Sequence, residues 1–109
     1  MKLSICDIEG EVVKDNETYL LKDNKTLNNL VLSSTLLHPY QETRGHKHEG
    51  QEEVYYFVSG TGQMKLDEEI FLVQGGDVVL IPDGKFHKVM NTSHNPLYFV
   101  CVFDGKRNH

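Results

Sequence analysis

Three histidines and one glutamate stand at spacings that suit a single metal ion. His46 and His48 are two residues apart, so an extended strand places both side chains on one face. Glu53 follows after a short segment that contains Gly50, and His87 lies in a second strand-like segment. Imidazole and carboxylate donors together suit a divalent transition metal that keeps positions open for substrate. The sequence therefore offers four donors that a folded barrel can bring to one point.

Short apolar segments separated by turn residues must position these donors. No window of a dozen residues has the apolar periodicity and cap of a helix. Many short strands joined by turns predict an all-β sandwich or barrel. We expect a tight hairpin turn at residues 59–62 and another turn at residues 67–69. The expected strands are Tyr19–Leu21, Leu30–His38, Val54–Ser59, Gln63–Leu66, Ile70–Val73, Asp77–Ile81, His87–Met90 and Leu97–Phe103.

The strand that begins near Glu53 separates two sets of side chains. Glu53, Tyr55 and Phe57 share one face, and the residues between them share the other. If Glu53 is a ligand, Tyr55 points into the same cavity, where it positions substrate, donates a proton or simply packs in the core. By the same alternation, the side chain of Glu52 lies on the other face from Glu53. It is either a catalytic carboxylate or an exposed charge at a strand edge.

Length and charge restrict the class of protein. The chain has 109 residues, enough for one domain, which we assign to 1–109. Its formal net charge of −5 and the lack of a basic stripe argue against a nucleic-acid partner. No apolar run is long enough to span a bilayer, and the first residues have no signal core. We therefore expect a cytoplasmic protein with no membrane partner, in which Cys6 and Cys101 are free thiols and Cys101 is buried.

The last expected strand, Leu97–Phe103, is apolar at both parities. A strand with one wet face alternates apolar and polar residues. We expect one face of this strand to line the core and the other to meet a second sheet or another subunit. Because two-fold dimers are the commonest oligomers, we favour a homodimer.

The segment 76–91 resembles the second conserved motif of the cupin superfamily, which reads G-x5-P-x-G-x2-H-x3-N. The chain matches every specified position, with Gly76, Pro82, Gly84, His87 and Asn91.

The segment 45–60 is similar to the first cupin motif, which reads G-x5-H-x-H-x3,4-E-x6-G. His46, His48, Glu53 and Gly60 match it, whereas its leading glycine is replaced by Tyr40. Gly45, next to the histidines, allows that loop an unusual backbone conformation.

This resemblance implies a jelly-roll barrel, also called a double-stranded β-helix. In the family, the motif residues bind one metal ion inside the barrel. The resemblance therefore implies one divalent transition metal, Fe, Mn, Ni or Zn, held by His46, His48, Glu53 and His87. It implies that Pro82 and the motif glycines form turns. A family member whose site stays empty is the alternative.

A second resemblance bears on the reaction. Thr43–His48, Glu53–Tyr55 and Gly60–Met64 are similar to the segments T-x-G-H-x-H, E-V-Y and G-x-G-x-M of cupin-type phosphosugar isomerases. This likeness implies a metal-dependent isomerase or epimerase that acts on a small sugar or sugar phosphate.

In such an enzyme Glu53, Glu52 or Tyr55 would move the proton. Four cations are candidates for an anion clamp: Arg44, Lys47, Lys85 and Lys88. By strand parity, Lys47 and Lys88 point away from the metal. The alternatives are an iron-dependent dioxygenase, which a cysteine near the metal would favour, and a non-catalytic module that binds a small ligand.

Overall fold

The structure is a computed structural model that describes residues 1–47 and 49–105. These residues form nine strands and no helix. None of them therefore provides a helix with the length and apolar character that crossing a bilayer requires. The strands are β1 (Glu11–Asp15), β2 (Tyr19–Asn24), β3 (Leu30–Leu37), β4 (Glu53–Ser59), β5 (Thr61–Leu66), β6 (Glu69–Gln74), β7 (Val78–Ile81), β8 (His87–Met90) and β9 (Leu97–Asp104).

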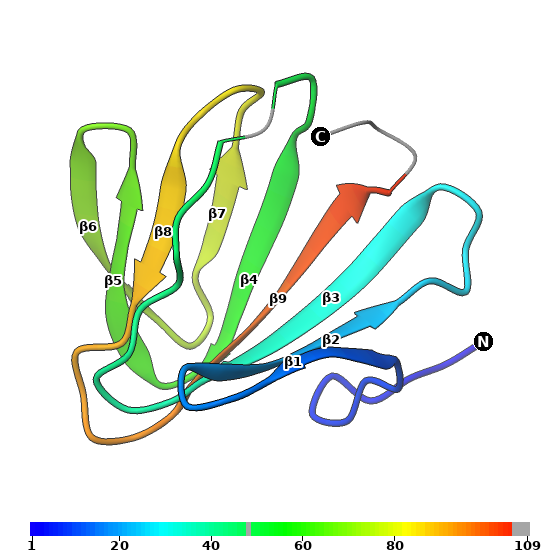
Figure 1. The fold of residues 1–109 in the computed structure, drawn as a ribbon, viewed down its shortest axis with the longest axis horizontal. Helices are drawn as coiled ribbons and strands as arrows, with labels where there is room; N and C mark the ends of the chain where they lie inside the picture. Colours follow the sequence, from blue (N-terminus) through cyan, green and yellow to red (C-terminus); the bar gives the residue numbers. More distant parts are fainter. Residues whose placement is uncertain (48, 106–109) are drawn as a thin grey trace.

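The strands form two antiparallel sheets (Figure 1). The larger sheet has the order β1-β2-β3-β9-β4-β7, and the smaller has the order β6-β5-β8. Neighbours such as β3 and β9 are far apart in sequence, so the connections cross between the sheets, as they do in a jelly roll. The all-β jelly-roll prediction is confirmed.

The core lies between the inner faces of the two sheets. Phe57, Leu37 and Leu97 from the larger sheet and Met64 and Val89 from the smaller are fully buried. Inward residues alternate with exposed or half-buried ones along β4, as expected for a strand with one buried face. This alternation directs every second β4 side chain toward the space between the sheets.

All eight expected strands are present, and one strand was missed. The missed strand β1 is exposed along its whole length, so its sequence has no buried face to produce a pattern. Strand β2 is longer than expected and continues through Asn24. The polar segment after Leu21, which looked like the start of a connection, therefore places Asp23 in the sheet.

One of the two expected turns is wrong. Residues 59–62 do not close a hairpin, because β4 pairs with β9 and β7 whereas β5 pairs with β6 and β8. The chain instead crosses from the larger sheet to the smaller at Gly60. The turn at 67–69 is confirmed, since Leu66 pairs directly with Glu69 across the β5–β6 hairpin.

Tyr40 explains how the chain departs from the first cupin motif without losing its shape. Its φ angle is 60°, in the left-handed region that favours the glycine of the motif. The backbone thus keeps the glycine-like conformation although a tyrosine occupies the position. The Tyr40 side chain is 68% exposed, so it meets little crowding there.

Candidate metal centre

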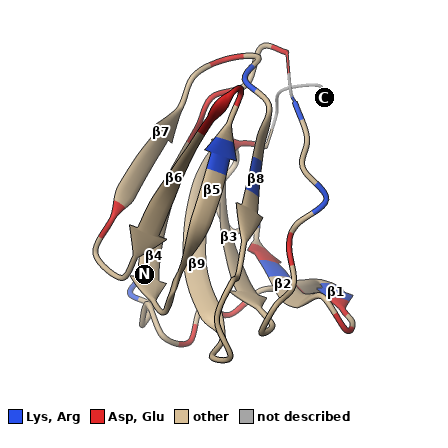
Figure 2. Cartoon of the chain, turned by 90° about the vertical axis from the view of Figure 1, so that its left-hand side faces the viewer, with Lys and Arg blue, Asp and Glu red and all other residues tan. Residues whose placement is uncertain are grey.

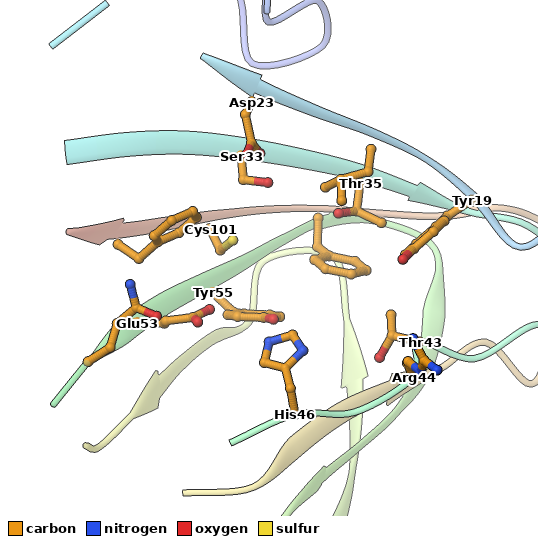
Figure 3. A pocket seen from close by; sticks show the side chains of 14 residues that line it. Tyr19, Asp23, Ser33, Thr35, Thr43, Arg44, His46, Glu53, Tyr55 and Cys101 are labelled. Carbon is orange, nitrogen blue, oxygen red and sulfur yellow. The ribbon is translucent and has the colours of Figure 1, made fainter. Parts of the chain in front are cut away.

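A cavity of about 210 Å³ lies against the inner face of the larger sheet (Figure 3). Strands β2, β3, β4 and β9 supply most of its wall, and the segment between β3 and β4 supplies the rest. Its lining includes Ser33, Arg44, His46, Glu53, Tyr55 and Cys101.

Backbone pairing with β8 positions His46. Its N–H donates to the carbonyl of His87 at 3.1 Å, and the N–H of His87 donates back at 3.0 Å. Glu42 also pairs with Met90. The segment from 42 to 46 therefore has one residue more than the segment from 87 to 90 that it pairs with. The additional residue forms a bulge, where Gly45 has a φ of 82°. As expected, this glycine gives the loop an unusual backbone.

Gly45 also leaves room for a neighbouring ring. A β-carbon at this position would lie 2.6 Å from Cζ of Phe86. A larger residue would therefore displace the Phe86 ring and would be strained at this positive φ.

His87 opens β8 and is buried, with 3% of its surface exposed. Its Nδ1 lies 3.1 Å from the carbonyl oxygen of Lys85. A carbonyl only accepts hydrogen bonds, so Nδ1 carries a proton, and in the neutral ring Nε2 is the nitrogen with the lone pair. The ring lies edge-on to His46, with 4.4 Å between the ring centroids. This tautomer presents a metal-binding nitrogen toward Glu53, and the Lys85 carbonyl fixes the ring as an outer-shell partner does in metal sites.

Glu53 is the buried carboxylate of the group. It begins β4, and its Oε1 lies 3.8 Å from Nε2 of His87. Burial raises the pKa of Glu53 from 4.5 to about 7, because water no longer solvates the charged form. A positive ion at this point would favour the charged form.

Donor atoms of His46, Glu53 and His87 all lie within 4.8 Å of one another. Ligands that bind one transition metal at about 2.1 Å lie up to ~4.2 Å apart. The residues therefore fit a metal with a small inward adjustment. The structure brings together three of the four predicted ligands. The fourth, His48, lies outside the described residues.

Tyr55 and Cys101 face each other across the β4–β9 pair and are both buried. The Tyr55 ring stacks on Phe99 with 5.4 Å between centroids and meets His87 edge-on at 5.7 Å. Burial raises the pKa of Tyr55, and Cys101 and Glu53 raise it further. Burial also raises the pKa of the Cys101 thiol. Both groups therefore stay protonated at neutral pH, beside the donor cluster.

The wall opposite the cluster carries polar side chains among apolar ones. Tyr19, Asp23, Ser33 and Thr35 line it (Figure 3). Sequence analysis did not assign these residues to the site. A Ser-Ser-Thr run inside an otherwise apolar strand was the available signal for Ser33 and Thr35, whereas Asp23 could not be found without the correct length of β2.

Gln51 was also missed, because it falls in a segment that we expected to be a turn. Its side chain is 4% exposed, lines the cavity and donates from Nε2 to the carbonyl of Asp104 at 3.1 Å. It thus joins the segment before β4 to the end of β9.

Several predicted residues do not reach the cavity. Glu52 is exposed and lies just before β4, and it is not among the residues whose donor atoms come together. Of the four cations proposed for an anion clamp, only Arg44 lines the cavity. The other three pair with carboxylates elsewhere: Lys47 with Glu49, Lys85 with Asp67 and Lys88 with Glu42.

Asn91 acts as a backbone clamp away from the donors. Its Nδ2 lies 3.1 Å from the carbonyls of Leu37 and His38 and 2.8 Å from that of Asn95. Its Oδ1 accepts from the N–H of Ser93 at 3.0 Å. The asparagine of the second motif therefore fixes the loop after β3 to the end of β8.

A comparison with protein families agrees with this geometry. The family described as the cupin domain, Cupin_2, matches residues 34–103. The chain belongs to the cupin family. The match covers both motif segments and the wall of the cavity from β3 to β9. The assignment of residues 1–109 to a single domain stays a prediction.

Proteins similar to this cupin in sequence are described in different ways. An uncharacterized protein of Methanocaldococcus jannaschii is 33% identical in a 94-residue alignment, which covers 76% of this chain and 75% of that protein. An oxalate-binding protein of Thermotoga maritima is 35% identical over 52% of this chain. A glucose-6-phosphate isomerase of Thermococcus gammatolerans is 26% identical over 85% of this chain. The chain spans about half the length of the latter two, 47% and 56%.

Solved structures share the fold. A Klebsiella pneumoniae protein with a double-stranded β-helix domain has a TM-score of 0.80 at 22% identity, covering 94% of this cupin and 88% of that chain. Bacillus subtilis oxalate decarboxylase, described with Mn(II) centres, has a TM-score of 0.79 at 22% identity. It is covered over 29% of its length, against 91% of this cupin. Identities this low establish the fold alone.

Proposed function

We propose that this cupin is a metal-dependent enzyme that isomerises or epimerises a small sugar or sugar phosphate. The observation that carries the proposal is one cavity with donors of the cluster on one side and the hydroxyls of Tyr19, Ser33 and Thr35 on the other. Sugar hydroxyls need such a wall, because buried polar groups must be hydrogen-bonded. The similarity of this cupin to a glucose-6-phosphate isomerase, over most of the chain, supports the same reaction class.

The metal would be held by His46, Glu53 and His87, with His48 as the fourth ligand from the motif. The ion is Fe, Mn, Ni or Zn, and the Mn(II) centres of the structurally similar oxalate decarboxylase favour Mn. When bound, a divalent ion of this kind polarises the substrate oxygens that it chelates.

The protein's own groups would bind substrate and move the proton. A carboxylate has two oxygens, so Glu53 can hold the ion with one and exchange a proton between adjacent substrate carbons with the other. Tyr55, protonated at neutral pH, would donate a hydrogen bond to the substrate oxygen beside it. Arg44 would bind a phosphate in the bidentate manner of guanidinium groups. Ser33 and Thr35 would hold the hydroxyls at the far end.

The test is isotopic exchange in D₂O. Metal-loaded protein with Mn²⁺ or Fe²⁺ is incubated with aldose and ketose phosphates and with the same sugars lacking phosphate. We expect interconversion with deuterium incorporation at the carbon that loses its proton. Arg44→Gln should impair the phosphorylated substrates selectively. Absence of both interconversion and exchange across the panel would refute the proposal.

A second candidate is an iron-dependent dioxygenase of a small molecule. The observation that favours it is Cys101, which lines the same cavity although it lies outside both motifs. Oxygen consumption by Fe²⁺-loaded protein with small diols and thiols tests this candidate. No uptake with any of them would remove it.

A third candidate is binding without turnover. The relative named as an oxalate-binding protein favours it, since Arg44 beside a metal could hold a small dicarboxylate. Calorimetric titration of Mn²⁺-loaded protein with oxalate decides this case. Tight binding with unchanged oxalate would support it, and no heat of binding would exclude it.

We assign these activities to the cytoplasm. Cys6 and Cys101 are both free thiols, as expected where the surroundings are reducing.

A further inference from the structure

Gln51 is a buried amide at the end of the cavity where β4 begins and β9 ends. Its side chain is 4% exposed and lines the cavity. Its Nε2 donates to the carbonyl oxygen of Asp104 at 3.1 Å. Because a carbonyl oxygen only accepts hydrogen bonds, this contact fixes the amide with its nitrogen toward Asp104. The amide oxygen, Oε1, is left for another partner.

Oε1 of Gln51 accepts no hydrogen bond from residues 1–47 and 49–105. Every side-chain oxygen that is fully enclosed in this part of the chain has a hydrogen-bond partner. Oε1 is therefore not enclosed, and it faces the cavity, which is the open space that Gln51 lines. The wall thus holds an acceptor with a fixed orientation, whose partner comes from whatever fills the cavity.

Gln51 lies at the same end of the cavity as Glu53. Strand register pairs Glu53 with Phe103, and Asp104, which holds Gln51, is the next residue along β9. Arg44 lies apart from this end, since Figure 3 shows Glu53 and Arg44 on opposite sides of the cavity. A substrate whose phosphate binds Arg44 would therefore bring its other end, with the carbons that react at Glu53, close to Gln51.

We propose that Gln51 is a specificity residue, which selects substrates by a hydroxyl group close to the reacting carbons. This inference rests on the proposed function, because it takes the ligand to be a sugar held at Glu53. The selected hydroxyl donates a hydrogen bond to Oε1. A substrate that lacks the hydroxyl leaves a buried acceptor without a partner, which costs free energy and weakens binding.

The same oxygen distinguishes sugars from small dicarboxylates. A hydroxyl group both donates and accepts hydrogen bonds, so a sugar satisfies Oε1. An ionised carboxylate only accepts, so it would place one acceptor against another. Gln51 therefore favours a ligand with several hydroxyl groups over oxalate at this end of the cavity.

The test measures binding rather than turnover. Sugar alcohol phosphates have no carbonyl group, so they can occupy the site without isomerising. Calorimetry with Mn²⁺-loaded protein compares ribitol 5-phosphate and glucitol 6-phosphate with the analogues that each lack one hydroxyl. At one position we expect removal of the hydroxyl to weaken binding about 10–100-fold in wild type. In Gln51→Met the same removal should weaken binding by less than about threefold, because the partner of that hydroxyl is already lost.

Two further variants separate recognition from folding. Gln74→Met makes the same substitution at an exposed position of β6, which carries charge only at its start (Figure 2), and should leave every affinity unchanged. Gln51→Asn keeps the amide on a shorter side chain and should reduce the selectivity in the same direction as Gln51→Met. Circular dichroism and Mn²⁺ binding verify that each variant is folded.

A hydroxyl whose contribution disappears with Gln51 supports the proposal. Equal losses in wild type and in both Gln51 variants at every hydroxyl position overturn it, because Gln51 would then only join the segment before β4 to β9. Failure of every sugar alcohol phosphate to bind wild type overturns it as well.

Oxalate gives the last comparison. Its affinity should stay unchanged or rise in Gln51→Met, and a loss as large as that for the sugar alcohol phosphates would contradict selection by a hydroxyl. Deuterium exchange with sugar phosphates is measured separately, so the isomerase reaction and the role of Gln51 can each fail without the other.

Discussion

The two faces of the larger sheet are built from the same strands and differ in chemistry. On the inner face, β4 contributes Glu53 and Tyr55 to the cavity. On the outer face, the same strand contributes Val54 and Tyr56. An antiparallel sheet usually buries apolar side chains and exposes polar ones, and here the arrangement is partly reversed.

The same reversal continues into neighbouring strands. Direct pairing joins Asp23, Ser33, Cys101 and Tyr55 in one inner row. Burying ionisable and hydroxyl groups costs free energy unless they find partners, so such a row is expected where a ligand binds. The polar inner row therefore agrees with a cavity that takes a ligand.

We expect the largest difference in metal affinity between variants of two adjacent glutamates. Glu53→Gln removes a charged donor from the inner face, so we expect Mn²⁺ affinity to fall about 1000-fold, or ~4 kcal/mol. Glu52→Gln changes an exposed residue just before β4 and should leave the affinity within about twofold. Calorimetric titration measures both. Equal losses in the two variants would mean that long-range charge, rather than a ligand, determines the affinity.

Two adjacent tyrosines allow the two faces of β4 to be compared by their effect on the reaction rate. Tyr55→Phe removes the phenol beside the donor cluster, and we expect the rate constant for isomerisation to fall about 100-fold with metal affinity unchanged. Tyr56→Phe, on the outer face of β4, should leave the rate within a factor of about two. Steady-state kinetics and Mn²⁺ titration separate the two effects. A normal rate for Tyr55→Phe would mean that Tyr55 packs in the core and takes no part in the reaction.

The raised pKa of Glu53 predicts how pH affects the metal-free protein. Because the pKa rises from 4.5 in the unfolded chain to about 7 in the folded one, the folded state holds this proton more tightly. The contribution of Glu53 to stability is therefore complete below about pH 4.5 and is lost as the pH rises through about 7.

Glu53→Gln removes this titration and provides the control. Between about pH 5 and pH 7.5, we expect wild type to lose about 1–3 kcal/mol of unfolding free energy relative to the variant. Urea unfolding in the presence of a chelator measures the difference. Parallel pH profiles for the two proteins would show that Glu53 titrates normally in the folded state.

The sequence predicted the inner face of β4 well and the opposite wall of the cavity poorly. Alternation in one strand is a local property, so Glu53, Tyr55 and Phe57 could be assigned to one face without a structure. The fold and the candidate donors His46 and His87 were instead implied by the resemblance to the two cupin motifs. The tight hairpin expected at Gly60 was wrong because a turn signal does not reveal which strands pair beyond it.

Residues whose position depends on neighbouring strands could not be predicted. Asp23 reaches the cavity only because β2 pairs with β3 through Asn24, and a lysine-aspartate-asparagine run has low strand propensity. Tyr40 adopts a positive φ that the surrounding loop imposes. Tertiary contacts overrode local preference at both positions.

The smallest effect compares two adjacent serines on β3, both nearly buried. Ser33 lines the cavity beside Cys101, whereas Ser34 faces outward and lies near Tyr98 and the N-terminal segment. Ser33→Ala should raise the KM for a sugar substrate about 3–10-fold and Ser34→Ala should not, because only Ser33 would contact substrate. Ser34→Ala should instead lower the unfolding free energy by about 1 kcal/mol. If Ser34→Ala alone raised KM, the wall that recognises substrate would not be the inner face of β3, and the contrast between the two faces would have to be redrawn.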